Sequence, residues 1–338
     1  MRILVVNVGS SSIKYAGFDG TRLFDGAVEH VKGRYDRAAS AMLKDVRTRG
    51  FEPEAIAHRI VHGFGLTRTS TYTKRVRERI VSGCGPAPLH NIPQLQVLDA
   101  LVPFNVVQIC VFDSLSYEFE DTVRTLPLPR AITKEHGLVR IGFHGISHTS
   151  VARRLKRARL ITVHLGSGSS VTAWKRGRAI WNSMGFTPED GVLMATRPGM
   201  LDPGTVAYLF RLGYPPERIE HILTRDSGLQ GITGRADLEG ILKKRREGNR
   251  YDLAVRMLAT SIAEAVARAA VHIGGVETIA FTGTIGVRSA AVRRAVIKKL
   301  SFLGPFTTEV LDTDEEQVIH DEARALLVSR RKRKNKNG

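Results

Sequence analysis

The N-terminal stretch Ile3-Leu4-Val5-Val6-Asn7-Val8-Gly9-Ser10-Ser11-Ser12 is an apolar run that ends in small polar residues. Half a chain later, the plan is repeated by Leu160-Ile161-Thr162-Val163-His164-Leu165-Gly166-Ser167-Gly168-Ser169-Ser170. A second extended run follows each stretch, at residues 13–18 and 170–174. Strand, Gly/Ser turn and strand predict a β-hairpin whose turn can present backbone N–H groups to an anion. The repeat predicts two domains of similar fold that face each other across a cleft.

A third glycine site lies late in the chain, where the apolar run Ile279-Ala280-Phe281 enters the turn Thr282-Gly283-Thr284-Ile285-Gly286. Residues 289–300 then have the apolar spacing of a helix, with Ser289 at its N-cap. Further helices are predicted at 93–102, 148–157, 204–212, 251–273 and 315–328. Strands that alternate with helices are typical of the α/β class.

The domain organisation follows from length and from the repeat. A chain of 338 residues is longer than one hydrophobic core usually serves. We expect one α/β domain over residues 1–113 and a second over residues 114–315. The helix at 316–328 is expected to pack back on the N-terminal domain, and residues 329–338 to form a basic disordered tail.

Composition excludes several classes of protein. Apolar residues make up 42% of the chain and charged residues 25%, which favours packed cores over disorder throughout. No apolar run is long enough to span a membrane, and the N-terminus has no basic region or cleavage site of a secretory signal. Cys84 and Cys110 have no motif spacing, which suits a reduced compartment. We expect a cytoplasmic protein.

The charge of the chain is unusual. The formal net charge is +18, and six of those charges lie in Arg330-Arg331-Lys332-Arg333-Lys334-Asn335-Lys336, so the rest of the chain still carries about +12. A basic surface attracts polyanions such as nucleic acid, nucleotides and polyphosphate. We favour a solvated tail and a general bias toward arginine, because no RNA-binding aromatic platform or zinc spacing accompanies the charge.

Several polar residues stand in apolar or Gly-rich surroundings: Arg59, Asp113, His144, Arg197 and a late Glu315. Each has a structural alternative, since a single Arg is often an ion-pair residue and an Asp after a strand is often a cap or turn residue. Taken with the two anion-binding hairpin turns, the set is typical of phosphoryl transfer, in which positioning and charge neutralisation supply most of the catalysis.

The chain is identified as a member of the acetate kinase family by an ordered series of motifs. The segment Asn7-x-Gly9-Ser10-Ser11-Ser12-x-Lys14 resembles the family's first signature, and Gly142-Phe143-His144-Gly145-x-Ser147-His148 resembles its second. Other matching segments follow in the family's order: His58-Arg59-x-Val61-His62-Gly63, Ala87-Pro88-Leu89-His90-Asn91, Val111-Phe112-Asp113, Ser183-Met184-Gly185-Phe186-Thr187-Pro188 and Asp202-Pro203-Gly204. The resemblance implies two duplicated ribonuclease-H-like domains around a central cleft, the fold of actin, Hsp70 and sugar kinases.

The resemblance implies reversible phosphoryl transfer from ATP to acetate or propionate, giving acetyl phosphate and ADP, with Mg²⁺ or Mn²⁺. Arg59 and Arg197 would grip the carboxylate and the transferring phosphoryl group, for which the planar guanidinium is suited. His144 would donate to the phosphoryl oxygens, Asp113 would orient groups at the centre, and Asn7 and Glu315 would support the metal. A carboxylate acceptor is already ionised at pH 7, so no strong general base is needed.

The remaining roles are also carried over from the family. A small pocket for the substrate's methyl group would be lined by Val61, Leu89, Phe143 and Pro188. Nucleotide phosphates would lie against Ser10, Ser12, Lys14, His164, Leu165, Gly166, Ser167 and Gly168. The rest of the nucleotide, bound by the second domain, would contact Asp237, Leu238, Glu239, Gly283, Thr284, Ile285, Gly286, Val287 and Arg288. A homodimer is the family's default.

The departures from the family lie on the nucleotide side. Ser167 replaces an Asn, Glu239 replaces an Arg, and Val287-Arg288 replaces Glu-Asn after the third glycine site. Met200 replaces an acidic residue, and Tyr117 replaces a His. These changes leave two alternatives open: the same chemistry with pyrophosphate or GTP as donor or with a longer acid, and a non-catalytic basic binding protein on the kinase fold. A contact of the basic tail with nucleic acid is a separate partner that no motif supports.

Overall fold

The computed structural model describes residues 1–9, 12–31 and 33–334 of the chain. The chain forms two compact units. The first comprises Met1–Ser116, His144–Ser150 and Asp314–Gly338, and the second comprises Tyr117–Phe143 and Val151–Thr313. The short segment 144–150 therefore lies in the first unit, whereas the sequence repeat predicts it in the second domain. It does so because Ile146 is fully buried in the first unit's core and the backbone N–H of Gly145 donates to the carbonyl oxygen of Asp113 at 2.6 Å.

The first unit is built on a six-stranded sheet with the order β3-β2-β1-β4-β6-β5. β1 and β2 form the predicted antiparallel hairpin, and β4 and β6 continue the sheet parallel to β1. The bounds are β1 Arg2–Val8, β2 Ile13–Asp19, β3 Thr21–Val28, β4 Ala55–Ile60, β5 Ser70–Thr71, β6 Val107–Phe112, α1 Tyr35–Thr48, α2 Lys74–Ser82, α3 Pro88–Leu101 and α14 Glu315–Lys334.

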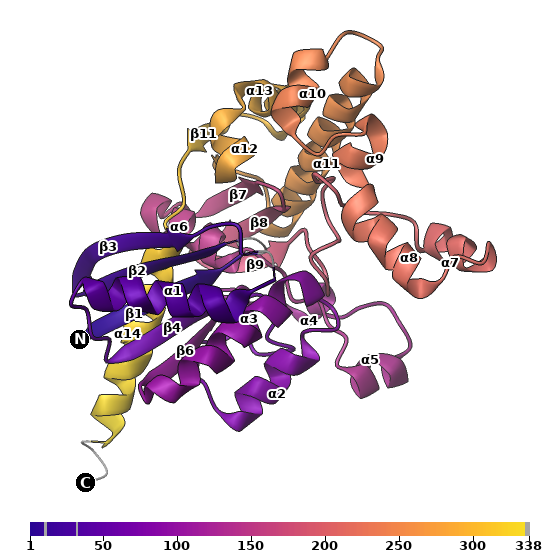
Figure 1. The fold of residues 1–338 in the computed structure, drawn as a ribbon. Coiled ribbons are helices and arrows are strands. Elements are labelled where there is room, and N and C mark those ends of the chain that lie inside the picture. Colours follow the sequence, from indigo (N-terminus) through magenta and orange to yellow (C-terminus); the bar gives the residue numbers. More distant parts are fainter. Residues whose placement is uncertain (10–11, 32, 335–338) are drawn as a thin grey trace. The chain divides into compact units, whose positions relative to one another are not determined.

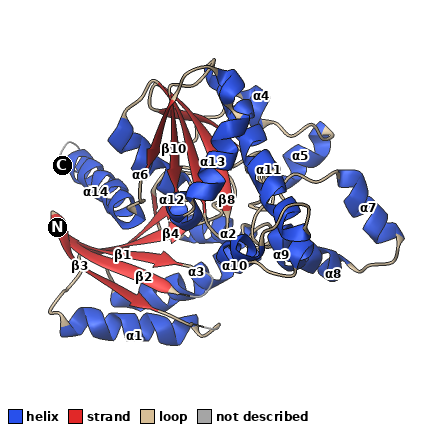
Figure 2. Ribbon diagram, turned by 90° about the horizontal axis from the view of Figure 1, so that it is seen from above, coloured by secondary structure: helices blue, strands red, loops and turns tan. Residues whose placement is uncertain are grey.

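Helices cover both faces of this sheet. α1 and α3 pack on one face, where Leu4 and Val6 of β1 meet Met42 of α1 and Val97 of α3. α14 packs on the other face, as the alternation of a strand requires, against Ile3 and Val5. Figure 2 shows α1 and α14 on opposite sides of these strands. Within this unit, α14 thus packs on the sheet that contains β1.

The second unit repeats the plan with a five-stranded sheet of order β11-β10-β7-β8-β9 (Figure 1). β7 and β8 form the second predicted hairpin, β9 extends it antiparallel, and β10 and β11 continue parallel to β7. The bounds are β7 Arg159–Leu165, β8 Ser169–Lys175, β9 Arg178–Asn182, β10 Thr278–Thr282, β11 Thr307–Val310, α4 Asp121–Arg124, α5 Arg130–His136, α7 Pro203–Arg211, α8 Pro216–His221, α9 Gly228–Thr233, α10 Leu238–Lys244, α11 Arg250–Ile273, α12 Gly283–Arg288 and α13 Ala290–Lys299. The predicted α/β duplication is confirmed.

The long helix α11 supplies the core of the second unit. It begins after the N-cap Asn249, whose side chain accepts a hydrogen bond from the N–H of Asp252, and it ends at Gly274 in the left-handed conformation. Its buried Val255, Ile262 and Val266 pack with β7, β8 and α13 in one apolar cluster. The opposite face of the sheet is covered by the C-terminal part of α6 (Gly145–Leu155).

Three predicted segments have different bounds in the structure. α3 begins at Pro88, five residues before the predicted start, because proline is tolerated in the first turn of a helix. The glycine turn after β10 is the helix α12 rather than an open loop. α14 continues to Lys334, so the prediction of disorder from residue 329 is wrong as far as residue 334. Arg and Lys are good helix formers, and their charges interact favourably with a helix C-terminus.

Two further observations concern the cysteines and the helices of the chain. Cys84 and Cys110 are both free thiols. Within the described residues, no helix combines the length and apolarity that crossing a membrane would require.

Candidate active site

The candidate site in the first unit lies where parallel strands end together. β1, β4 and β6 run side by side, and Asn7, Arg59 and Asp113 stand at or just beyond their carboxyl ends. Strand carboxyl ends in an α/β sheet share one edge, which is where ligands usually bind in such folds. The sheet therefore brings together three residues that lie more than fifty positions apart in the sequence.

Arg59 is the centre of a hydrogen-bonded network. Its Nε and Nη2 atoms donate to Oδ1 and Oδ2 of Asp113 at 3.3 and 3.1 Å. Its Nη1 atom donates to Oδ1 of Asn7 at 3.3 Å and lies 3.8 Å from Oε2 of Glu315. This paired, two-point contact with Asp113 fixes the plane of the guanidinium, which is the geometry in which Arg holds an anion best.

Burial and charge act against each other on Arg59. The side chain is only 16% exposed, and burial alone would lower the pKa of the guanidinium. The carboxylates of Asp113, Glu315 and Glu316 outweigh burial and raise the pKa above its usual value. The guanidinium is therefore a fixed positive charge in a partly desolvated place, where its attraction to an anion is stronger than in water.

His144 stands directly before α6 in a left-handed conformation, with φ of 57°. Such a φ is uncommon for a residue with a side chain, and it is held here by two contacts to one residue. The backbone N–H of His144 donates to Oδ2 of Asp113 at 3.1 Å, and the next N–H, of Gly145, donates to the Asp113 carbonyl oxygen. Gly145 cannot carry a Cβ, because it would lie 2.5 Å from that oxygen. Asp113 thus positions both Arg59 and His144.

The first turn of α14 contributes two carboxylates, where the positive end of the helix dipole favours them. The side-chain amide of Asn7 donates to Oε2 of Glu315 and to Oε1 of Glu316, both at 3.0 Å. The family motifs predict Glu315 and miss Glu316. The signal that could have found Glu316 is the acidic run at residues 312–316, in which two consecutive carboxylates open a helix.

The turn of the first hairpin is closed by a hydrogen bond from the N–H of Gly9 to the carbonyl oxygen of Ser12 at 2.8 Å. Lys14 pairs with Asn7 across the two strands and is exposed. Ser10, which is predicted to bind phosphate, lies outside the described residues. The first unit therefore brings Ser12 and Lys14 to the strand edge that carries Asn7.

The residues predicted to line the acceptor pocket are divided between the units. Val61 and Leu89 belong to the first unit, and Phe143 and Pro188 belong to the second. Val61 is buried, and its N–H donates to Oε1 of Gln94 at 2.9 Å. Phe143 is also buried, at 1% exposure.

Two residues to which the sequence assigns no role hold the backbone of Phe143. The hydroxyl of Tyr117 donates to the Phe143 carbonyl oxygen at 2.6 Å, and Nδ2 of Asn182 donates to the Tyr117 hydroxyl oxygen at 2.8 Å. Oδ1 of Asn182 also accepts from the N–H of Met184 at 2.8 Å. Tyr117 therefore supports the segment that leads into His144, a role that needs tertiary contact and leaves no local pattern.

Arg197 lies in the second unit, on the irregular segment between β9 and α7. Its Nη1 atom donates to the carbonyl oxygen of Pro188 at 2.9 Å. Burial lowers the pKa of Arg197, and the nearby Glu189 acts in the opposite direction. The segment is held by Gly228, whose φ of 63° brings its Cα so close that a Cβ would lie 2.9 Å from the Arg197 nitrogen.

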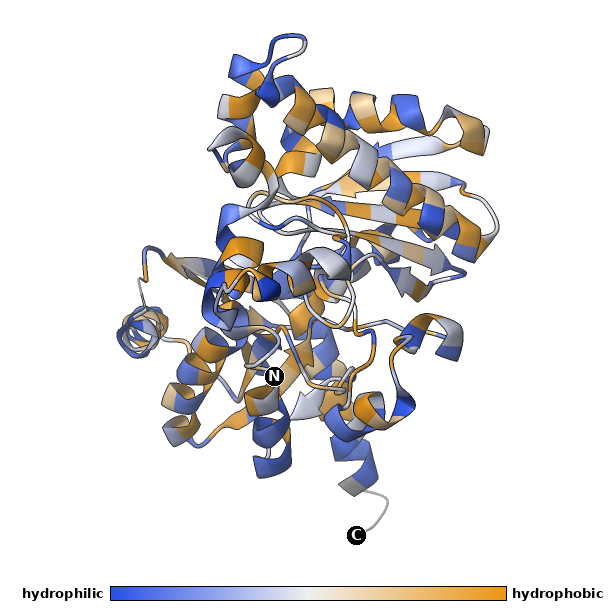
Figure 3. Cartoon of the chain, turned by 90° about the vertical axis from the view of Figure 1, so that its right-hand side faces the viewer, coloured by the Kyte–Doolittle hydropathy of each residue, from blue (hydrophilic) through white to orange (hydrophobic). Residues whose placement is uncertain are grey.

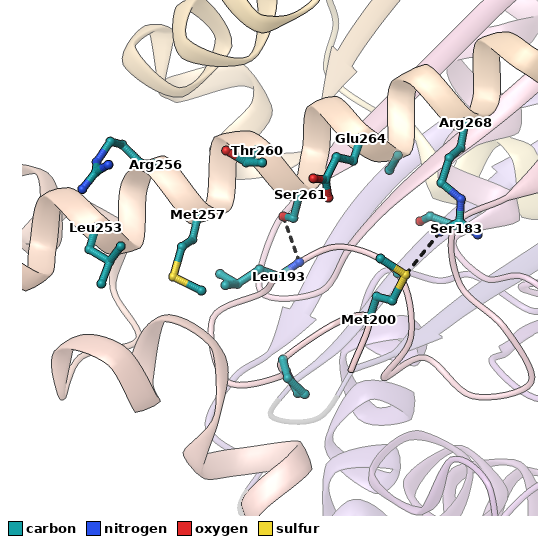
Figure 4. A pocket seen from close by; sticks show the side chains of 13 residues that line it. Ser183, Leu193, Met200, Leu253, Arg256, Met257, Thr260, Ser261, Glu264 and Arg268 are labelled. Atoms are coloured by element: carbon teal, nitrogen blue, oxygen red, sulfur yellow. Dashed lines mark hydrogen bonds between the residues drawn. The ribbon is translucent and has the colours of Figure 1, made fainter. Parts of the chain in front are cut away.

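A cavity of about 370 Å³ lies beside this segment within the second unit, between α11 and residues 191–200 (Figure 4). Its wall includes Leu193, Met200 and Met257, and none of the predicted site residues lines it. The N–H of Leu193 donates to Oγ of Ser261 at 3.1 Å, drawn as a dashed line in Figure 4. This bond fastens the segment that carries Arg197 to the longest helix of the unit.

The glycine loops of the second unit present backbone rather than charge. The N–H of Gly166 donates to the carbonyl oxygen of Gly168 at 3.0 Å, which closes the turn around Ser167. His164 and Leu165 are the last residues of β7 before this turn. Gly283, at φ of 76°, approaches the same strand so closely that a Cβ would lie 2.6 Å from the Leu165 carbonyl oxygen. Thr284, Ile285, Gly286, Val287 and Arg288 then form α12. The structure brings these two predicted loops together.

The charged residues predicted beside the nucleotide are engaged with their own neighbours. Asp237 caps α10 by accepting from the N–H of Gly240, and it forms an ion pair with Arg235 at 2.8 Å. Glu239 forms an ion pair with Lys243 at 2.6 Å, while Leu238 is buried beneath them. Both carboxyl groups are exposed, so these pairs are weak and can be exchanged for a ligand.

Comparison with known proteins shows the family. The model of the Acetokinase family matches residues 34–335. An acetate kinase of Shouchella clausii is 34% identical over 348 residues, covering 90% of this chain and 88% of the relative.

Solved structures agree with this assignment. The crystal structure of Porphyromonas gingivalis acetate kinase has a TM-score of 0.85 at 28% identity, covering 96% of this chain and 99% of that one. A propionate kinase from Francisella tularensis subsp. tularensis gives 0.85 at 29% identity, covering 95% and 98%. With its duplicated sheets and its arginine-centred site at the strand ends, the chain belongs to the acetokinase family.

Proposed function

We propose that the protein is an acetate kinase. An acetate oxygen attacks the γ-phosphorus of ATP, the bond from that phosphorus to the bridging oxygen of ADP breaks, and acetyl phosphate and ADP are released. The observation that carries the proposal is the Arg59 network, a partly buried cation held in plane by Asp113 and Asn7 at distances of 3.1 to 3.3 Å. A fixed guanidinium lowers the repulsion between two anions that must approach each other.

This geometry supports the following roles. Arg59 binds the acceptor carboxylate and the transferring phosphoryl group, and Asp113 keeps it oriented. Since Asp113 also accepts the N–H of His144, the imidazole is carried on the same support and donates to phosphoryl oxygens as charge spreads onto them. Arg197 supplies the second guanidinium, and its partial burial strengthens its attraction to an anion.

The donor set near Asn7 fits a hard divalent ion. Asn7, Glu315 and Glu316 offer only oxygen ligands, which Mg²⁺ prefers. Among the described residues, no group of three His, Cys, Asp or Glu side chains could enclose a metal ion on its own. Mg²⁺ usually keeps several waters and binds through one or two carboxylates and the substrate phosphates, so Asn7 and Glu315 suffice to hold it. When bound, the ion neutralises charge on the phosphates.

Nucleotide binding is assigned to the glycine loops of the second unit. The N–H groups around Gly166 and Gly168 and the backbone at Gly283 can approach phosphates without a side chain between. Ser12 and Lys14 contact the phosphates from the first unit's hairpin. We include a homodimer in the proposal, supported by exposed apolar side chains on α7 and α11, among them Phe210 and Met257. The free thiols are compatible with a cytoplasmic location.

The proposal is tested by trapping acetyl phosphate as its hydroxamate. Purified protein is given ATP, GTP or pyrophosphate in turn, with acetate, propionate or butyrate and with Mg²⁺ or excess chelator. We expect activity with ATP and Mg²⁺, with acetate best, propionate weaker and butyrate weakest, because each methylene changes binding by only about 1–3 kcal/mol. Activity with pyrophosphate and not with ATP would show that pyrophosphate, rather than ATP, is the donor. No product with any donor would favour a binding protein over an enzyme.

A further inference from the structure

The end of α14 leaves the body of its unit. Val318, Ile319 and Ala323 are buried in the core, and Leu326 and Leu327 pack against it. From Val328 to Arg333 every residue is exposed, yet the helix continues to Lys334. Seven residues of helix after Leu327 extend about 10 Å, at about 1.5 Å per residue. In Figure 3 these turns, next to the C-terminal label, are coloured as hydrophilic.

The charge on this projection surrounds the helix. Arg330, Arg331, Lys332 and Arg333 are consecutive, and successive helical residues point about 100° apart, so no side of the helix is neutral. Within residues 1–9, 12–31 and 33–334, no ion pair is found for any of these four side chains. Arg330 instead contacts the hydroxyl of Thr71. Four like charges without carboxylate partners repel one another, and an external anion would relieve that repulsion.

A second basic segment lies against the same helix. Thr69 Oγ1 donates to Oε2 of Glu322 at 3.2 Å, and Thr71 contacts Arg330, so residues 69–71 follow the last turns of α14. Three exposed cations flank these contacts along the chain: Arg68, Lys74 and Arg75. Lys74 and Arg75 occupy the first turn of α2, where positive charge opposes the helix dipole. Residues 68–75 and 328–333 contain no Asp or Glu, and the nearest carboxylates along the chain are Glu78, Asp321 and Glu322.

We infer that the end of α14 and residues 68–75, together called the basic ridge, bind the phosphate backbone of double-stranded nucleic acid without sequence preference. Guanidinium groups match phosphate oxygens in pairs, and charge on all sides of a projecting helix suits a groove lined by phosphates on both sides.

Two observations separate duplex nucleic acid from other polyanions. The turn Ser329-Arg330-Arg331-Lys332-Arg333 has no apolar face with which to enter a lipid surface. Tyr72 is the only aromatic residue of the ridge, and its hydroxyl donates to Asp99 at 2.8 Å, so no platform stacks the bases of a single strand. The inference does not depend on the proposed enzymatic reaction.

The test compares two triple variants in which neutral, helix-compatible Gln replaces three exposed cations. R331Q/K332Q/R333Q removes charge from the ridge. R294Q/K298Q/K299Q removes the same charge from the exposed side of α13 in the second unit. Fluorescence anisotropy with a labelled 20-base-pair DNA of mixed sequence gives Kd as a function of NaCl. Thermal unfolding of the ridge variant followed by circular dichroism, expected to match wild type, shows that the variant is folded whether or not the chain is an enzyme.

We expect the ridge variant to bind the duplex at least ~10-fold more weakly than wild type, with the slope of log K against log salt reduced by about 2 to 3, since each phosphate contact contributes about 0.9. The α13 variant should change Kd by less than about 2-fold. K74Q/R75Q should weaken binding several-fold while raising the melting temperature, because charge that opposes the dipole of α2 is removed. Equal weakening by both triple variants would overturn the inference. Tighter binding to anionic vesicles or to a single-stranded oligonucleotide would overturn it as well.

Discussion

The two units carry one strand plan and two kinds of chemistry. In the first, Val6 pairs with His58 and His58 with Cys110; in the second, Val163 pairs with Phe281 and Phe281 with Val310. These pairings define which positions of the two sheets correspond.

The matched positions just beyond these pairs differ in character. Arg59 corresponds to Thr282, Asp113 to Thr313, and Asn7 to His164. The first unit places a charged network at its strand ends, while the second places two threonines and a histidine there, with close backbone approach at Gly283. The duplicated strand order thus sets where a loop stands, and the side chains decide whether that loop carries a charged network or a close backbone contact.

The largest effect should come from removing an arginine of the candidate site. We expect Arg59→Ala to lower kcat at least ~10²-fold, the scale seen when one preorganised contact to developing charge is lost. Arg59→Lys should rescue little, since an ammonium cannot make the two-point contact with Asp113. Arg197→Ala should cost a similar factor. Steady-state hydroxamate kinetics measure all three.

The control for these substitutions is Arg77→Ala. Arg77 also forms a two-point ion pair, with Asp99, but on the exposed surface of the first unit. The kcat of the Arg77→Ala variant should equal that of wild type. Wild-type turnover in Arg59→Ala would remove Arg59 from the site.

The second prediction concerns the close backbone approach of Gly283 to β7 in the second unit. Gly283→Ala places a Cβ 2.6 Å from the Leu165 carbonyl oxygen at a φ of 76°, so we expect a loss of at least about 2 kcal/mol in the free energy of unfolding and a raised KM for ATP. Gly274→Ala is the matched control, because Gly274 has φ of 72° but a Cβ added there would meet nothing within 4 Å. It should lose only about 1 kcal/mol and leave KM unchanged. Equal losses by urea denaturation would show that close approach is unimportant.

The third prediction concerns His58, which stands where the second unit has Phe281. His58 is buried at 2% exposure, and burial lowers its pKa to about 4, although the hydrogen bond to Gln108 acts in the opposite direction. In the unfolded chain the imidazole has a pKa near 6.5 and binds the proton more readily. The free energy of unfolding that the neutral buried imidazole contributes is therefore fully present above pH 6.5 and is lost as the pH falls toward 4. At pH 5 the loss should be about 2 kcal/mol.

His58→Phe isolates this contribution. The variant should be less stable at pH 7, because the Gln108 side-chain oxygen loses its partner, but the loss between pH 7 and pH 5 should be about 2 kcal/mol smaller than in wild type. His30→Gln, at an exposed position, should leave the pH dependence unchanged. Parallel pH profiles for wild type and His58→Phe would contradict a neutral buried imidazole.

Much of the fold could be predicted from local pattern. Both hairpins, the duplication and α11 follow from apolar periodicity and glycine placement, which act over a few residues. The start of α3 at Pro88 and the extension of α14 to Lys334 could not be predicted this way. The first depends on proline at a helix start, and the second on packing of Leu326 and Leu327 that holds the preceding turns.

The site could be predicted to the extent that its residues lie in motifs. Asn7, Arg59, Asp113 and Glu315 are predicted from short segments, and the structure brings them within one network. Asn182 acts through Tyr117, a partner distant in sequence, which no local spacing reveals. The grouping around Arg59 required the parallel register of β1, β4 and β6.

The smallest expected effect tests whether the position of the Gly283 loop depends on the N-cap of α13. Ser289 is the predicted N-cap, and its Oγ accepts from the N–H of Val292 at 3.4 Å, a long bond. Ser289→Ala should therefore lower the free energy of unfolding by only about 0.5–1 kcal/mol, the low end for a lost cap, and Ser289→Gly by a few tenths. Because α13 is anchored on the core through Val292 and Val296 rather than through its cap, KM for ATP should stay within about 2-fold of wild type. A larger rise in KM without further loss of stability would mean that the cap, and not Gly283 alone, sets the position of the loop.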